Sequence, residues 1–273
     1  MGLPNAARAF DELSGVYDET RSPPSPATVA GVLDGLRRAG VTRLLEVGVG
    51  TGRFARPLAD GGLGVVGVDA SRRMLERARA KGIAGLVQGS AHRLPFPDRA
   101  FDGALFVHVL HVVDRPEAAL REAVRVSRRG AFALLSPTRP GGRSTPDPES
   151  PIRLLIRDLA DHGWPVTDRP RAPGQREAEL LAAHPPDETV TVSDQEVTEP
   201  VGRRLDLVAR RASRHFRDVP PELLDAAIAR VRARIGDRTR TFRRVELLVR
   251  WGSRSRVGEP APGPPLTSRT GGP

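Results

Sequence analysis

The stretch Leu44-Leu45-Glu46-Val47-Gly48-Val49-Gly50-Thr51-Gly52 decides the fold of this chain. The apolar run that begins it predicts a buried strand, and the strand ends in an acid and three glycines at a spacing of two. Glycines at that point let the backbone approach a ligand closely, and open α/β sheets bind ligands at the carboxyl ends of their strands. The stretch therefore predicts a ligand-binding turn in an α/β sheet.

Two nucleotide-binding motifs fail to describe this turn. A dinucleotide fingerprint, G-x-G-x-x-G, needs a glycine where the chain has Arg53. A mononucleotide P-loop ends in Gly-Lys followed by Ser or Thr, and the one lysine of the chain, Lys81, lies far from the turn. Neither motif explains the sequence.

A second strand ends in an acid as well. The run Val65-Val66-Gly67-Val68-Asp69 places a carboxylate 17 residues after Gly52. Such a carboxylate can accept hydrogen bonds from both hydroxyls of a ribose, because it carries two oxygens and no donor.

The region around these motifs alternates between strands and helices. The apolar patterns predict five strands, at 43–47, 63–68, 83–88, 101–107 and 131–136. Helices are predicted between them at 52–59, 72–81 and 117–126. This alternation is typical of a parallel sheet with right-handed crossovers.

The regions before and after this alternation have other patterns. Two helices are predicted before the first strand, at 4–18 and 26–39. After a connection rich in Gly, Pro and Ser, helices are predicted at 152–162, 176–183, 201–214 and 221–235. Alternating segments at 188–193 and 241–251 predict two more strands, and the Pro- and Gly-rich tail from Gly252 is expected to be disordered.

Two further motifs complete a family pattern. They are Gln88-Gly89-Ser90-Ala91-His92-Arg93-Leu94-Pro95-Phe96 after the third strand and Val109-Leu110-His111-Val112-Val113-Asp114 after the fourth. With the acid-x-Gly-x-Gly-x-Gly turn, they make the sequence resemble the class I S-adenosylmethionine-dependent methyltransferases, in particular the small-molecule group called methyltransferase type 11. The family has Asp where this chain has Ser90, and Pro where it has Arg129.

The resemblance implies an α/β, Rossmann-like fold with a mostly parallel seven-stranded sheet, helices on both faces and a helical substrate lid. Residues 1–40 would be helices that cover the cofactor, 41–138 the core that binds it, 139–251 the lid and the closing strands, and 252–273 the tail. The cofactor would be S-adenosyl-L-methionine. The residues implied to surround it are Tyr17, Glu46, Gly48, Gly50, Gly52, Asp69, Ala70, Met74, Ser90, Ala91 and Val107.

The same resemblance implies methyl transfer to an oxygen, nitrogen or carbon atom of a small metabolite. The sulfonium is an activated methyl donor, so the protein mainly aligns the reactants, and a base helps only when the acceptor arrives protonated. His108 and His111, after the fourth strand, are the candidate bases. The other histidines have no companion at metal-ligand spacing, so no metal is predicted.

Charge and composition limit the remaining functions. The chain has 273 residues, no cysteine and a formal net charge of +10, and residues 201–257 hold 16 arginines against six carboxylates. This Arg-rich segment, residues 201–257, fits a solvated lid, a site for an anionic substrate, or RNA binding. The missing N-P-P-Y-type corner after the fourth strand disfavours nucleic acid as a substrate. A cofactor-binding protein without catalysis is a further alternative.

The sequence says little about the location of the protein in the cell and about its assembly. A chain without cysteine and without an apolar run long enough to cross a bilayer is expected to be cytoplasmic and to lack a membrane span. Nothing in the sequence predicts an oligomeric state.

Overall fold

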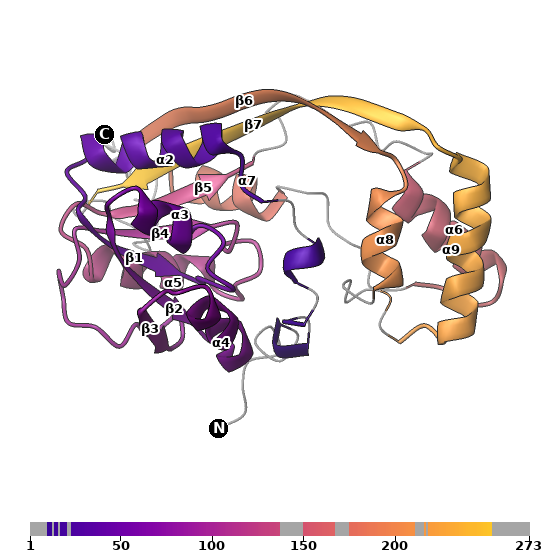
Figure 1. The fold of residues 1–273 in the computed structure, drawn as a ribbon, viewed down its shortest axis with the longest axis horizontal. Coiled ribbons are helices and arrows are strands. Elements are labelled where there is room, and N and C mark those ends of the chain that lie inside the picture. Colours follow the sequence, from indigo (N-terminus) through magenta and orange to yellow (C-terminus); the bar gives the residue numbers. More distant parts are fainter. Residues whose placement is uncertain are drawn as a thin grey trace, which may run out of the picture.

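The protein is a seven-stranded, mostly parallel sheet with helices on both faces. The computed structural model describes residues 10–12, 14–15, 17–20, 23–136, 150–166, 175–210, 216 and 218–252. The strands follow the order β3-β2-β1-β4-β5-β7-β6 across the sheet (Figure 1). Their bounds are β1 Arg43–Val47, β2 Gly64–Asp69, β3 Gly85–Gln88, β4 Gly103–Val107, β5 Ala131–Leu135, β6 Glu188–Pro200 and β7 Thr239–Trp251.

The predicted fold class is confirmed. Strands β1 to β5 pair in parallel, and β7 runs antiparallel to both β5 and β6. The helices in the described residues are η1 Asp18–Thr20, α2 Pro26–Arg38, α3 Ala55–Asp60, α4 Arg72–Ala80, α5 Pro116–Arg125, α6 Pro151–Asp161, α7 Gln175–Ala183, α8 Arg203–Ala209 and α9 Pro221–Ile235.

Several predicted elements differ in extent from the observed ones. The helix predicted at 52–59 begins at Ala55, because the glycine turn extends further along the chain. The strand predicted at 188–193 continues to Pro200, because its backbone stays paired with β7 from Glu188↔Arg250 to Pro200↔Thr239. The helix predicted at 201–214 is described only as α8, and most of the predicted helix at 4–18 and of the tail lies outside the described residues.

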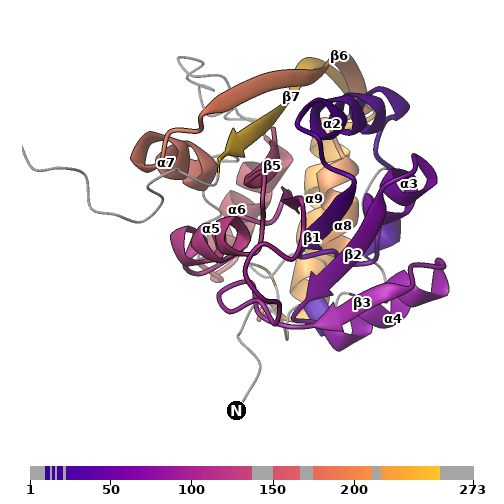
Figure 2. The ribbon, with the colours of Figure 1, turned by 90° about the vertical axis from the view of Figure 1, so that its left-hand side faces the viewer.

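Apolar side chains cover both faces of the sheet. Leu44, Leu105 and Phe132 are buried under α2 and α3 on one face, with Leu36 of α2 packed among them. On the other face Leu45 and its neighbours pack beneath α5 and α7. Figure 2 shows the two sets of helices on opposite sides of the strands. Burial on both faces explains why these strands read as nearly continuous apolar runs.

Strands β6 and β7 extend beyond the sheet as a two-stranded ribbon. Their register shifts between Thr191 and Ser193, which marks a β-bulge at the point where the ribbon leaves the core. The ribbon arches to a helical cluster made of α6, α8 and α9 (Figure 1). That cluster has its own apolar core, which includes Leu155, Leu205 and Leu224.

No helix among the described residues has the length and apolar character that crossing a membrane requires.

Candidate functional site

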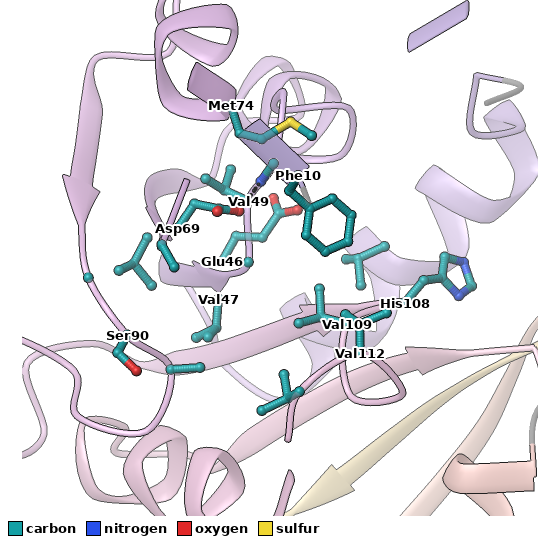
Figure 3. Close-up of a pocket in the computed structure, with 18 of the residues that line it drawn as sticks. Phe10, Glu46, Val47, Val49, Asp69, Met74, Ser90, His108, Val109 and Val112 are labelled. Atoms are coloured by element: carbon teal, nitrogen blue, oxygen red, sulfur yellow. Dashed lines mark hydrogen bonds between the residues drawn. The ribbon is translucent and has the colours of Figure 1, made fainter. Parts of the chain in front are cut away.

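A cavity of about 250 Å³ opens at the carboxyl ends of β1, β2 and β4. Figure 3 shows its lining side chains converging from these strands and from the loops that follow them. The cavity wall includes ten of the residues implied to bind the cofactor, namely Tyr17, Glu46, Gly48, Gly50, Asp69, Ala70, Met74, Ser90, Ala91 and Val107. His108 and His111 line it as well.

Gly50 and Gly52 of the turn have different surroundings. Gly50 has a φ of +56°, and a Cβ placed on it would meet no atom within 4 Å, so its position faces open space. Gly52 does not line the cavity, and a Cβ there would lie 2.1 Å from Cδ1 of Ile83. The structure therefore gives Gly52 a packing role, where the family pattern implied cofactor contact.

Two acids lie behind the turn, the half-buried Asp69 and the buried Glu46. Asp69 accepts hydrogen bonds from the backbone N–H groups of Gly50 and Ser71, both at 2.8 Å. Glu46 is only 2% exposed, and its Oε2 has no hydrogen-bond partner among the described residues. Burial, together with the nearby charge of Asp69, raises the pKa of Glu46 to about 8. An unpartnered buried carboxyl of this kind suits a ligand that brings a positive charge or a hydrogen-bond donor.

The segment before α2 covers the cavity. The rings of Phe10 and Tyr17 line it, with their centroids 6.2 Å apart. Asp18 fixes this segment to the core, since it accepts from Thr51 Oγ1 at 2.6 Å and pairs with Lys81 at 2.6 Å. The segment that carries Tyr17 thus lies beside the glycine turn.

Ser90, which replaces the family's Asp, is engaged within its own loop. Its Oγ accepts from the backbone N–H of His92 at 3.2 Å and lies 3.4 Å from the Nδ1 atom of that ring. His92 also lines the cavity, and burial lowers its pKa. Met74 is 1% exposed, so it contributes both to the core and to the cavity wall.

Each histidine at the mouth of the cavity lies beside a carboxylate that sequence reasoning missed. His111 Nδ1 lies 2.9 Å from Glu177 Oε1, and His108 Nε2 lies 3.7 Å from Glu246 Oε1. Glu246 also accepts a hydrogen bond from the hydroxyl of Thr28. Glu246 could have been noticed in the sequence as an acid within the alternating segment that forms β7. No sequence feature distinguishes Glu177 from the other polar residues of α7.

Many arginines of the Arg-rich segment are paired within the protein. Arg230 contacts Asp158 at 2.6 Å, and Arg210 contacts Glu19 at 2.9 Å. Ion pairs also involve Arg203, Arg232, Arg240, Arg243 and Arg250. These pairs offset much of the charge that the sequence concentrates there.

Residues 45–135 match the family model described as "Methyltransferase domain". A phosphatidylethanolamine N-methyltransferase from Cereibacter sphaeroides is 41% identical over 100 residues, which are 34% of this chain and 49% of that protein. A demethylmenaquinone methyltransferase from Renibacterium salmoninarum is 34% identical over 135 residues, 48% of this chain and 57% of that protein. The chain spans about half the length of these curated relatives.

Among solved structures, the YcgJ protein from Bacillus subtilis superposes with a TM-score of 0.50 at 18% identity, covering 82% of this chain and 98% of that one. At this identity the likeness concerns the fold alone. Together with the matched family model, it agrees with the sheet order and with the glycine turn at the cavity. Residues 45–135 of the chain are therefore similar in sequence to a methyltransferase domain, and the fold agrees with that similarity.

Proposed function

We propose that this protein transfers a methyl group from S-adenosylmethionine to a small molecule, with the cofactor held in the cavity beside the glycine turn. The observation that carries the proposal is the convergence of Gly50, Asp69 and Glu46 on one cavity whose mouth bears two histidines. A binding pocket with a few convergent polar groups and perturbed acids is the usual form of a small-molecule site.

The residues present fit the cofactor. The open space at Gly50 leaves room for close backbone approach. Each oxygen of the Asp69 carboxylate accepts a backbone hydrogen bond and can accept a further one, so Asp69 can also accept hydrogen bonds from ribose hydroxyls. Glu46 offers a buried oxygen without a partner to the cofactor's ammonium group. Ala70, Met74, Ser90 and Ala91 would form the adenine end of the site.

His108 and His111 are the candidate bases at the mouth. The bound cofactor supplies a methyl group that is already activated on a sulfonium, so the protein's own work is to orient the acceptor, exclude water and, where needed, accept a proton. Carboxylates beside both imidazoles suit proton transfer, and this argues for catalysis over simple cofactor binding.

The nature of the acceptor is not settled by the relatives. By their names, one acts on phosphatidylethanolamine and another on demethylmenaquinone, which are chemically different acceptors. The arginines that suggested RNA or an anionic substrate have carboxylate partners at several positions, so an anionic ligand would have to compete with those carboxylates.

Calorimetry and a product screen test the proposal. The protein should bind S-adenosylmethionine and S-adenosylhomocysteine with dissociation constants near 1 μM, about −8 kcal/mol. A thermal shift with NAD or ATP and none with either cofactor form would refute it. Incubation of a metabolite extract with isotopically labelled cofactor should give a labelled small product, whereas a labelled RNA product would point to the alternative function.

A further inference from the structure

The pairing of His111 with Glu177 adds a residue to the site that no motif contains. Glu177 lies on α7, which packs on the sheet face that α5 also covers. Its side chain is 13% exposed, whereas that of His111 is 41% exposed and lines the cavity. The ring therefore has one nitrogen against a largely buried carboxylate while part of its surface remains open.

We propose that Glu177 is the positioning residue for His111: its carboxylate faces Nδ1, which favours a proton on that nitrogen and leaves Nε2 unprotonated to act as the base toward a hydroxyl group of the acceptor. The proposal rests on the proposed function for its reaction and on the 2.9 Å separation of Nδ1 from Oε1 for its geometry. A carboxylate behind one nitrogen of an imidazole fixes the tautomer and stabilises the protonated ring.

The reaction balances with these groups alone. The acceptor oxygen bonds to the methyl carbon while the carbon–sulfur bond breaks, and that bond's electron pair stays on sulfur. The hydroxyl proton passes to Nε2 of His111, whose positive charge faces Glu177, and is later released to water. A base of this kind is of use only when the acceptor is a hydroxyl that is not ionised near neutral pH, such as a phenol or an enol.

The surrounding charges agree with an uncharged acceptor. His108, Asp114, Arg53 and His92 line the same cavity, and Glu246 approaches His108 from β7. Burial tends to raise the pKa of Glu177, but the contact with His111, the charge of His108 and a backbone hydrogen bond together offset this effect, so the pKa is lowered. Glu177 therefore stays ionised, and with Glu246 it would repel a carboxylate or phosphate substrate.

The pair His108 and Glu246 has a less direct geometry. Its nitrogen and oxygen are 3.7 Å apart, and Glu246 is already held by the hydroxyl of Thr28. His108 also adopts a φ of +51°, which is uncommon for a residue with a side chain. This contrast assigns the base to His111 and provides an internal comparison for the test.

The test is side-chain ¹⁵N NMR of the histidines in the labelled full chain, with His111 assigned through a His111→Gln variant. In the wild type, Nε2 of His111 should resonate as an unprotonated ring nitrogen. In Glu177→Gln the proton should no longer prefer Nδ1, because the carboxylate that faces this nitrogen is lost. The matched control is Glu179→Gln, an equal charge change on the exposed side of the same helix, which should leave the tautomer of His111 as in the wild type. An unchanged tautomer of His111 in Glu177→Gln would overturn the proposal.

The labelled product provides the second readout. We expect a methyl ether, a kcat more than tenfold lower in Glu177→Gln with a similar KM, and partial recovery in Glu177→Asp. A methyl ester of a carboxylate or phosphate as the product would overturn the assigned acceptor class. If no methylated product forms while the tautomer of His111 responds to Glu177→Gln as expected, the proposed function fails and the contact between Glu177 and His111 stands.

Discussion

Replacing Gly50 by alanine should strongly weaken cofactor binding without unfolding the protein. Its Cβ would enter open space in the cavity, since no atom lies within 4 Å, and we expect it to take up room that the cofactor needs beside the turn. Overpacking of a filled site costs about 1–3 kcal/mol. We expect a dissociation constant for S-adenosylhomocysteine at least about 100-fold higher, or about 2.7 kcal/mol.

Backbone strain must be separated from this steric effect. The φ of +56° at Gly50 makes any L-residue unfavourable by about 1–2 kcal/mol. Gly62 is the matched control, because it also has a positive φ, +91°, with open space around its Cβ position, but it lies in the turn after α3, outside the cavity wall. Gly62→Ala should lower the melting temperature by a few degrees, as Gly50→Ala does, and should bind normally.

Gly52→Ala should affect stability more than Gly50→Ala does. Its Cβ would collide with Ile83 at 2.1 Å, so this variant should lose stability well beyond the strain of its backbone. Isothermal titration calorimetry and thermal melts of the three variants measure both quantities. If Gly50→Ala binds S-adenosylhomocysteine within threefold of the wild type, the cofactor does not lie against the turn and the reasoning fails.

Three further variants test the acids of the core. Asp69→Asn should weaken S-adenosylhomocysteine binding about 10- to 100-fold in calorimetry, because a charged acceptor for hydroxyls is lost; unchanged affinity would place the ribose elsewhere. The raised pKa of Glu46, about 8, means that the ligand-free protein loses stability as pH rises from 4.5 through 8, and Glu46→Gln should remove this loss in melts at pH 6 and 9. Parallel melts for the two proteins would contradict the burial argument. Asp102 accepts hydrogen bonds from Thr42 and Arg43, which outweigh burial and lower its pKa to about 2. Asp102→Asn should cost about 2 kcal/mol in urea unfolding at pH 7, a difference that shrinks as pH falls from 3.8 through 2; a constant difference would show that the charge is not involved.

Prediction from sequence worked best where the signal was local. The strand before Glu46, the glycines after it and the strand before Asp69 lie within a short stretch, and each depends on neighbours along the chain. The acids and glycines at the ends of these strands predicted a ligand site at the carboxyl edge of the sheet, and the cavity lies there. The order of the strands, in contrast, came from the structure.

For elements beyond the core, the sequence predicted whether a segment forms a helix or a strand, but not where the segment ends. The alternating pattern at Glu188 showed a strand, yet its continuation to Pro200 depends on pairing with β7 along its whole length. Backbone groups on an isolated strand have no partner, so the partner decides where the strand ends. The arch that carries the helical cluster is therefore a tertiary result.

The fold class, the glycine turn and the acids that face the cavity could be predicted from the residues alone. The contact of Glu177 with His111, the approach of Glu246 to His108 and the close packing of Gly52 against Ile83 became apparent only in the folded protein. The reason is physical: periodicity and turn chemistry act over a few residues, whereas ion pairs and steric limits depend on which distant side chains folding brings within a few ångströms.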